Sequence, residues 1–290
     1  MRIVITGADG QLGGELVRAL AVQAEVIGTT LADLDVTDSC CAEKLASLRP
    51  DWVVHAAAAT DVDGCEGEPE RAMAVNAEGT RRVAEGCRRV GAGLVYVSTD
   101  YVFDGCKGTT YFEDDPPAPM NVYGWSKLKG ERATQDIASP WVIVRSAWLY
   151  GTRGKNFVTT ILEKAAAGER LRVVDDQVGA PTYAVDLADA VGLLLSRRLN
   201  GLYHVTNGGS CSWYEFARQI LRLAGVTAPL SRISSAELSR LARRPAYAVL
   251  ENAAWRTAGL PPLRPWLEAL AAMLAALKAV DSSENSRPAI

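Results

Sequence analysis

Hydrophobic residues along the chain alternate between short continuous runs and stretches with helical spacing. In the first half, apolar residues recur at intervals of three and four, as at Leu12, Leu16, Val17 and Leu20. Short apolar runs precede and follow such stretches, at residues 2–6, 24–30, 52–54, 94–97 and 141–145. Strands that alternate with helices are typical of a doubly wound parallel sheet, an α/β fold of the Rossmann type. Ligands of such folds bind at the carboxyl ends of the strands.

The pattern becomes less regular after about residue 150. Helices are predicted there over residues 154–167, 184–197, 212–224 and 265–279, separated by stretches rich in Gly and Pro. We therefore expect residues 1–150 to form the sheet domain, with some later segments returning to the sheet. Residues 151–280 are expected to form mainly a smaller C-terminal lobe, and residues 281–290 a disordered polar tail.

Composition and charge exclude several classes of protein. The hydrophobic content of 48% and the charged content of 22% are those of a soluble globular protein. The net charge of −3 argues against a nucleic-acid partner. No apolar run reaches the ~18 residues that a membrane span needs, and the N-terminal run is too short for a signal peptide. None of the six cysteines is spaced as Cys-x-x-Cys, so we expect reduced thiols in a cytoplasmic protein.

Three glycines follow the first predicted strand. Gly7, Gly10 and Gly13 stand in a G-x-x-G-x-x-G pattern where residues 2–6 give way to a helix. Gly7 would permit a tight turn, Gly10 the close approach of a pyrophosphate, and Gly13 close packing of the helix on the strand. Glycines at such a turn can also be purely structural. With its strand and helix, the pattern predicts an NAD(P)-binding domain over residues 1–150.

The next two strands do not decide which nicotinamide cofactor binds. An acidic residue at the end of the second strand would bind the ribose of NAD, but this strand ends at Thr30 and no arginine replaces the acid. NADPH and NADH therefore both remain open. Asp35 and Val36 either face the adenine or only precede the next helix. Small residues at 56–60 either admit a cofactor or pack tightly.

A phenol and an amine four residues apart suggest acid–base chemistry. Tyr123 and Lys127 lie on one face of a predicted helix, and a nearby ammonium can lower the pKa of a phenol. Thr99, just after the strand at 94–97, could share a substrate oxygen with that phenol. The two histidines, His55 and His204, end apolar runs, where packed or locally bonded imidazoles are expected. With so few histidines a multi-histidine metal centre is excluded.

This order of glycine turn, strand-end Ser-Thr and Tyr-x-x-x-Lys resembles the extended short-chain dehydrogenase/reductase superfamily. Within it, the chain is similar to the dTDP-4-dehydrorhamnose reductase family over about residues 1–270. The segments that carry the similarity are residues 7–13, 98–105, 123–127, 145–151, 156–157 and 176–182. The resemblance implies that NADPH or NADH reduces the 4-keto group of a dTDP-6-deoxyhexulose, giving dTDP-L-rhamnose from dTDP-4-dehydro-L-rhamnose.

The resemblance also implies roles for individual residues. Tyr123 would protonate the developing alkoxide, Lys127 would lower the phenol pKa and hold the nicotinamide ribose, and Thr99 would bond the carbonyl oxygen. The smaller lobe would bind the nucleotide sugar. Implied substrate contacts are Thr99, Asp100 and Trp148, although Trp148 could equally be a core indole. Implied cofactor contacts are Gly7, Gly10, Gln11, Leu12, Gly13, Thr30, Asp35, Val36, Ala58, Ala59, Thr60, Tyr123 and Lys127.

Several points remain open at this level. Thr30 stands where the family often carries an acid, no metal site can be assigned, and a homodimer is left open. A related ketoreductase or epimerase would use the same residues on another nucleotide-linked sugar, as in the pathway to streptose. A non-catalytic regulatory subunit, like the β subunit of methionine adenosyltransferase, is a further alternative. The presence of Thr99, Tyr123 and Lys127 favours an enzyme, because a binding module needs no proton donor.

Overall fold

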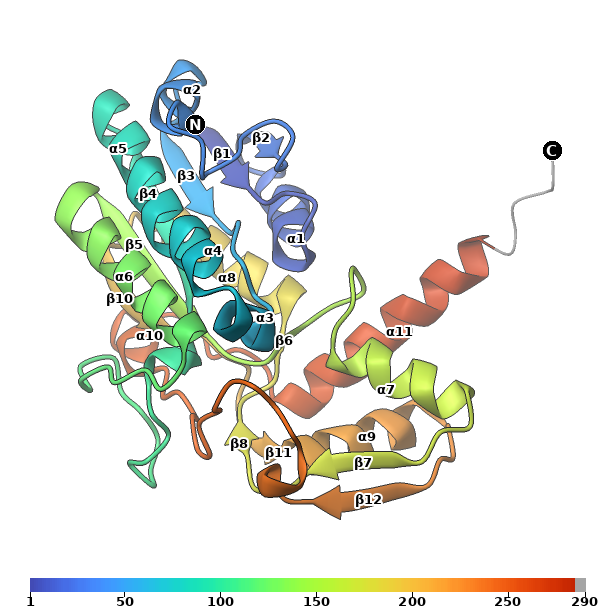
Figure 1. The fold of residues 1–290 in the computed structure, drawn as a ribbon. Helices are drawn as coiled ribbons and strands as arrows, with labels where there is room; N and C mark the ends of the chain where they lie inside the picture. The colour runs from blue at the N-terminus through green and yellow to red at the C-terminus, as the bar shows by residue number, and fades with distance from the viewer. Residues whose placement is uncertain (285–290) are drawn as a thin grey trace.

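A six-stranded parallel sheet forms the centre of the larger part of the molecule in the computed structural model, which describes residues 1–284 (Figure 1). The strand order is β2-β1-β3-β4-β5-β10. These strands are β1 (Arg2–Thr6), β2 (Glu25–Thr29), β3 (Trp52–His55), β4 (Gly93–Thr99), β5 (Trp141–Ser146) and β10 (Gly201–His204). The five predicted strands and the doubly wound α/β fold are confirmed. Strand β10 was not predicted, and it is one of the later segments that return to the sheet.

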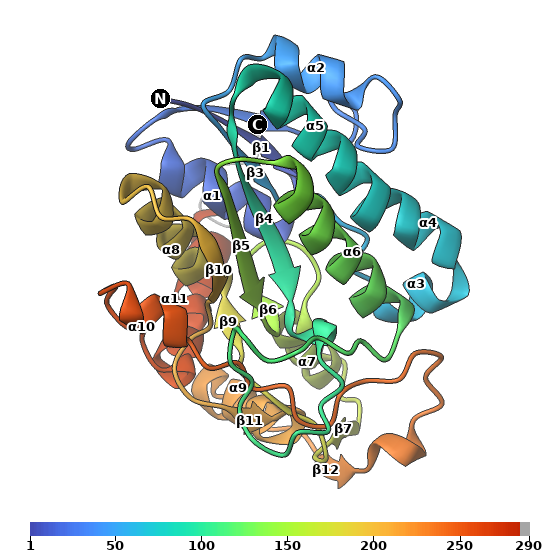
Figure 2. The same ribbon diagram turned by 90° about the vertical axis from the view of Figure 1, so that its left-hand side faces the viewer.

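Helices cover both faces of the sheet (Figure 2). Helices α1 (Gln11–Leu20) and α8 (Ala184–Ser196) pack on one face, where Leu16 and Leu194 are fully buried. Helices α2 (Cys41–Ser47), α5 (Thr80–Val90) and α6 (Val122–Ile137) cover the other. Strands buried on both faces are expected to be apolar throughout, which explains why the strands read as continuous runs.

A second group of elements has an apolar cluster of its own. It contains helices α7 (Phe157–Ala166), α9 (Trp213–Ala224) and α11 (Trp266–Glu284), and the parallel pair β7 (Leu171–Val174) and β12 (Leu230–Ile233). Its cluster includes Phe216 and Met273. The boundaries near residues 150 and 280 remain a prediction. Helix α11 continues past the expected end at 279, and residues 285–290 of the expected tail lie outside the described residues.

The remaining elements are short. They are α3 (Val62–Gly67), α4 (Pro69–Met73), a π-helical turn (Ala74–Gly79), 3₁₀ turns at Asp100–Val102 and Ser235–Glu237, β6 (Leu149–Tyr150), β8 (Val178–Gly179), β9 (Thr182–Tyr183), β11 (Cys211–Ser212) and α10 (Ala253–Thr257). Within residues 1–284, every helix is too short or too polar to cross a membrane.

The topology places a binding crevice at one edge of the sheet. From β1 the chain crosses to β2 on one side, and then to β3 on the other side of β1. The carboxyl ends of β1 and β3 therefore form a topological switch point, where ligands bind in open α/β sheets. Gly7 follows β1 at this point with a φ of +69°, a conformation that suits glycine.

Helix α1 approaches the turn after β1 so closely that only glycine fits at one position. A Cβ atom on Gly13 would lie 1.9 Å from the carbonyl oxygen of Gly7. The neighbouring Gly14 is different, because the atoms nearest to a Cβ atom there belong to the flexible side chain of Arg153. The predicted packing role of Gly13 is thus confirmed.

We expect Gly13→Ala to lower the free energy of unfolding by about 1–3 kcal/mol, because the added methyl group forces helix α1 away from the turn. The matched control is Gly14→Ala, which should be neutral or stabilise by up to about 1 kcal/mol, since alanine favours a helix interior. Urea unfolding of both variants measures the difference. Equal stability of the two variants would contradict the close packing at Gly13.

Candidate active site

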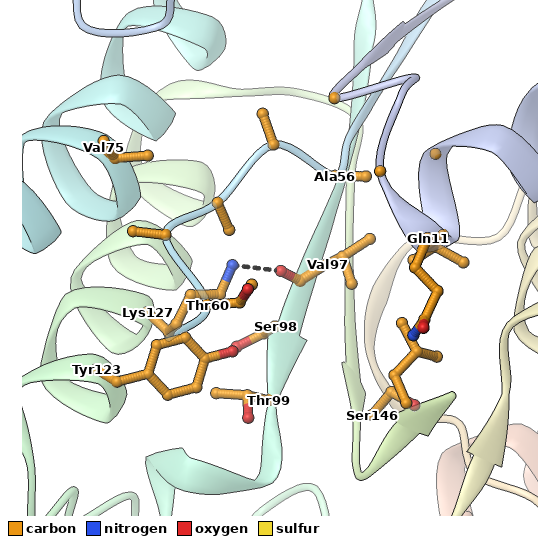
Figure 3. Close-up of a pocket in the computed structure, with 18 of the residues that line it drawn as sticks. Gln11, Ala56, Thr60, Val75, Val97, Ser98, Thr99, Tyr123, Lys127 and Ser146 are labelled. Atoms are coloured by element: carbon orange, nitrogen blue, oxygen red, sulfur yellow. Dashed lines mark hydrogen bonds between the residues drawn. The ribbon is translucent and has the colours of Figure 1, made fainter. Parts of the chain in front are cut away.

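A pocket of about 680 Å³ opens at the carboxyl ends of β1, β3, β4 and β5. It contains the residues singled out by the sequence for cofactor, substrate and proton transfer. These are Gly7, Gly10, Gln11, Leu12, Gly13, Thr30, Asp35, Val36, Ala58, Ala59, Thr60, Thr99, Asp100, Tyr123, Lys127 and Trp148. In Figure 3, Tyr123 and Lys127 reach from helix α6 towards the end of strand β4, with Gln11 and Ser146 across the pocket.

Lys127 is held in place by strand β4. Its ammonium donates a hydrogen bond of 2.6 Å to the carbonyl oxygen of Val97 (Figure 3), and it lies 4.2 Å from the centre of the Tyr96 ring. The residue is only 3% exposed. Burial lowers the pKa of Lys127 to about 7, and the negative charge of Glu131 acts in the opposite direction.

Tyr123 stands in the first turn of α6, which Asn121 caps by accepting a hydrogen bond of 2.8 Å from the backbone of Gly124. Burial raises the pKa of Tyr123 above its usual value, and a hydrogen bond with Thr99 partly opposes this rise. Burial is the largest influence on this pKa, and the expectation that Lys127 lowers it remains a prediction. The ammonium of Lys127 donates its hydrogen bond to Val97. A phenol with a raised pKa keeps its proton until a stronger base takes it.

Three polar groups in the pocket lack partners. The hydroxyl of Thr99 donates to Oδ1 of Asp100 at 3.0 Å, and burial raises the pKa of Asp100 to about 7. Oδ2 of Asp100, Oε1 of Gln11 and Oγ of Ser146 are buried with no hydrogen-bond partner among the described residues. All three residues line the pocket. Buried polar atoms are normally bonded, so these groups indicate a site shaped for a polar ligand.

The other end of the pocket fits a dinucleotide. Gly10 precedes helix α1, whose first backbone N–H groups favour an anion. A Cβ atom on Gly10 would lie 3.1 Å from the Gly7 carbonyl oxygen, so the turn is closely packed here as well. At the end of β2, the backbone and the hydroxyl of Thr30 both donate to Asp33, at 2.9 and 2.8 Å. Asp33, one of the acids nearest to this strand end in the sequence but given no role there, is thus bonded to Thr30.

Asn76 supports the segment at 58–60 and was not predicted as a site residue. Its side chain accepts a hydrogen bond from the Ala59 backbone at 2.8 Å and donates to the Ala59 carbonyl oxygen at 2.9 Å. It also donates to the hydroxyl of Ser126 on α6 at 2.9 Å. The signal in the sequence was a polar residue that interrupts the apolar face of a helix. Asn76 lies in the π-helical turn between α4 and α5.

Two stacked indoles form one wall of the pocket. The rings of Trp148 and Trp213 lie with their centres 3.5 Å apart and 7° between their planes, and both residues line the pocket. Trp148 has a φ of +45°, and a Cβ atom on Gly179 would lie 2.4 Å from its ring. Trp148 is therefore a pocket residue as well as a packed one. No feature of the sequence singled out Trp213, which begins helix α9.

Both histidines are packed and locally bonded, as expected. The ring of His55 lies 2.7 Å from the Thr6 hydroxyl and 3.1 Å from that of Thr80. Nδ1 of His204 lies 3.2 Å from the carbonyl oxygen of Tyr111. Burial lowers the pKa of each histidine to about 3, which leaves Tyr123, Lys127 and Asp100 as the titratable groups of interest.

The chain is similar to known reductases over almost its whole length. It is 44% identical to a dTDP-4-dehydrorhamnose reductase of Streptomyces griseus, covering 95% of this chain and 94% of the relative. It is also 44% identical to a probable dTDP-4,6-dihydroxy-2-methyloxan-3-one 4-ketoreductase of Streptomyces antibioticus, covering 93% of each chain. The crystal structure of a dTDP-4-dehydrorhamnose reductase from Bacillus anthracis in complex with NADP superimposes with a TM-score of 0.91, at 38% identity, covering 95% of this chain and 99% of that one.

The family model described as the RmlD substrate binding domain matches residues 1–279. This match includes the glycine turn, the strand-end Thr99 and the pair Tyr123 and Lys127. The chain therefore belongs to the RmlD family, that of the dTDP-4-dehydrorhamnose reductases.

Proposed function

We propose that the protein uses NADPH or NADH to reduce the 4-keto group of a dTDP-6-deoxyhexulose, converting dTDP-4-dehydro-L-rhamnose to dTDP-L-rhamnose. The observation that carries the proposal is the convergence of Thr99, Tyr123 and Lys127 in one pocket with the glycine turn. The similarity to named dTDP-4-dehydrorhamnose reductases, one of them solved with NADP, supports both the substrate and the cofactor.

The chain contributes proton transfer and orientation. A bound nicotinamide cofactor supplies the hydride for C4 of the sugar. Tyr123 donates its proton to the oxygen at that carbon, and Thr99 hydrogen-bonds the same oxygen. The charge of Lys127 stabilises the phenolate that remains after the transfer. Asp100, whose Oδ2 lacks a partner within the described chain, accepts a hydrogen bond from a sugar hydroxyl.

The cofactor residues divide the pocket into two halves. Gly10 admits the pyrophosphate to the N–H groups of Gln11 and Leu12 at the start of α1, in a turn that Gly7 and the close packing at Gly13 make possible. Thr30, Asp35 and Val36 contact the adenosine end, and Ala58, Ala59 and Thr60 lie along the nicotinamide half, where Lys127 also reaches the ribose. Trp148 and Trp213 contact the nucleotide sugar.

A second substrate is supported by one specific similarity. The Streptomyces antibioticus relative is named as a probable 4-ketoreductase of a different dTDP-linked sugar. The same proton donor would serve that reaction, so the choice of substrate depends on the residues beyond 150 that face the sugar. The cytoplasmic location, the homodimer and the lack of a nucleic-acid partner remain predictions.

The function is tested with purified protein, NADPH and enzymatically prepared dTDP-4-dehydro-L-rhamnose. We expect oxidation of NADPH that depends on the sugar, with dTDP-L-rhamnose as the product identified by mass spectrometry and NMR. Reduction of another dTDP-ketosugar alone would support the second substrate. A lack of oxidation with every dTDP-ketosugar would refute the proposal.

Replacement of the proton donor should abolish most of the activity. We expect Tyr123→Phe to lower kcat by about 10²–10⁴, the usual contribution of a general acid, while the dissociation constant for NADPH changes little. Tyr214→Phe on helix α9 is the matched control, because Tyr214 lies outside the pocket lining, and it should retain full activity. A Tyr123→Phe enzyme as fast as the wild type would show that another group donates the proton.

Burial of Lys127 makes stability depend on pH. Its pKa is about 7 in the folded protein instead of the usual 10.5, so between these values the unfolded chain binds more protons and the free energy of unfolding rises with pH. We therefore expect Lys127→Met to stabilise the protein by a few kcal/mol below pH ~7, with the gain disappearing near pH 10.5. Urea unfolding across this range measures it. Lys129→Met, on the exposed face of the same helix, should show no such dependence.

The stacked indoles should matter for the sugar and not for the cofactor. We expect Trp213→Ala to raise KM for the nucleotide sugar by about 3–10-fold, because an aromatic pair contributes about 0.5–1.5 kcal/mol beyond its buried area. Steady-state kinetics and NADPH titration check this. Trp125→Ala, an exposed tryptophan outside the pocket, is the control. An unchanged KM in Trp213→Ala would place the sugar elsewhere in the pocket.

A further inference from the structure

A buried carboxylate lies directly behind the reacting pair. Glu131 follows Lys127 by four residues on helix α6, so Tyr123, Lys127 and Glu131 succeed one another along one face. Glu131 is 2% exposed. It accepts hydrogen bonds from Nε and Nη2 of Arg145 on β5, at 2.8 and 2.7 Å. The hydroxyl of Ser98 on β4 donates to it at 2.5 Å.

These bonds join three elements at the level of the reacting groups. Val97, Ser98 and Thr99 are consecutive residues of β4. Val97 accepts the hydrogen bond from Lys127. Helix α6 is therefore tied to β4 twice within two consecutive strand residues, once by Lys127 and once by Glu131. Arg145 adds a tie from β5. The distance between Tyr123 and Thr99 depends on these bonds, because Tyr123 and Thr99 come from the two elements they join.

We propose that Glu131 is a positioning residue that fixes helix α6 against strand β4 and keeps the ammonium of Lys127 charged. The assignment rests on the proposed function, because that function gives Lys127 its role in the reaction. Glu131 does not line the pocket, so it acts through Lys127 and Ser98 and not on the substrate itself.

Among the groups around Lys127, Glu131 is the one whose charge favours the protonated form of the lysine. Facing it are Tyr96 of β4, whose ring lies beneath the ammonium, and His55 of β3, which burial keeps neutral. Tyr123, one turn earlier on α6, keeps its proton. Burial lowers the pKa of Lys127, and Glu131 is the charge that raises it. Removal of the carboxylate should therefore leave Lys127 largely neutral at pH 7.

Stability alone is a weak reason for this arrangement. A buried ion pair contributes little net stability compared with apolar residues of the same size, because both charges lose their hydration. The carboxylate nevertheless satisfies Arg145, and loss of one partner would leave an uncompensated buried charge. A test must therefore separate an electrostatic effect on Lys127 from a loss of folding.

The test measures the titration of Lys127 directly. Protein labelled with ¹³C at the lysine ε-carbon is titrated by NMR, and Lys127→Met identifies the signal. We expect Glu131→Gln to lower the titration midpoint of Lys127 by about one pH unit or more. The double variant Glu131→Gln with Arg145→Met removes both buried charges, so no uncompensated charge is left to unfold the protein. The titration midpoint of Lys127 should fall in this variant as well. Asp136→Asn, which removes an exposed charge from the same helix, should leave the midpoint unchanged.

The outcomes separate the alternatives. A purely structural Glu131 would destabilise the protein in Glu131→Gln, recover stability in the double variant, and leave the Lys127 midpoint where it is in the wild type; this result would overturn the proposal. If Glu131→Gln does not fold, the double variant decides. The titration needs no substrate, so a failure of the proposed function would show in the wild-type assay and not here. In that assay, the pH at half-maximal kcat should move with the midpoint in the same variants.

Discussion

The contact between helix α6 and strand β4 determines what the pocket can do. Tyr123 and Lys127 belong to the helix and Thr99 to the strand, so the reacting groups meet only where the two elements are in register. The bonds from Lys127 to Val97 and from Ser98 to Glu131 set that register. They also bury the amine of Lys127 and the carboxylate of Glu131. Burial lowers the pKa of Lys127 and the charge of Glu131 raises it, and the balance of these two effects sets the charge near Tyr123.

The sheet topology brings this contact to the cofactor half of the site. Strand β4 neighbours β3, and β3 neighbours β1, whose end carries the glycine turn. Parallel strands deliver their carboxyl ends to one edge, so the turn after the first strand and the end of the fourth strand line the same pocket. Asn76 then fixes the segment after β3 to helix α6 through Ser126. The pocket is thus built from separate segments that only the fold brings together.

Sequence patterns predicted the parts that depend on local rules. Apolar runs marked the strands, the glycines marked the turn, and a four-residue interval placed Tyr123 and Lys127 on one face. Residues that depend on distant contacts could not be predicted. Trp213 meets Trp148 across 65 positions, and Glu131 meets Ser98 across 33. The spacing placed Lys127 near Tyr123, but it did not reveal how deeply the phenol is buried, and this burial raises the pKa of Tyr123.

The stacked indoles give the site an optical property of its own. Trp148 and Trp213 lie nearly face to face, with ring centres 3.5 Å apart. At such a separation the electronic transitions of two chromophores mix, so the pair absorbs circularly polarised light as one unit. The coupling depends on the distance between the rings and on the relative orientation of their transition dipoles, and both change when either ring moves. A molecule that moves either ring therefore changes the ultraviolet dichroism of the protein, and the wall of the pocket reports on its occupant without any added label.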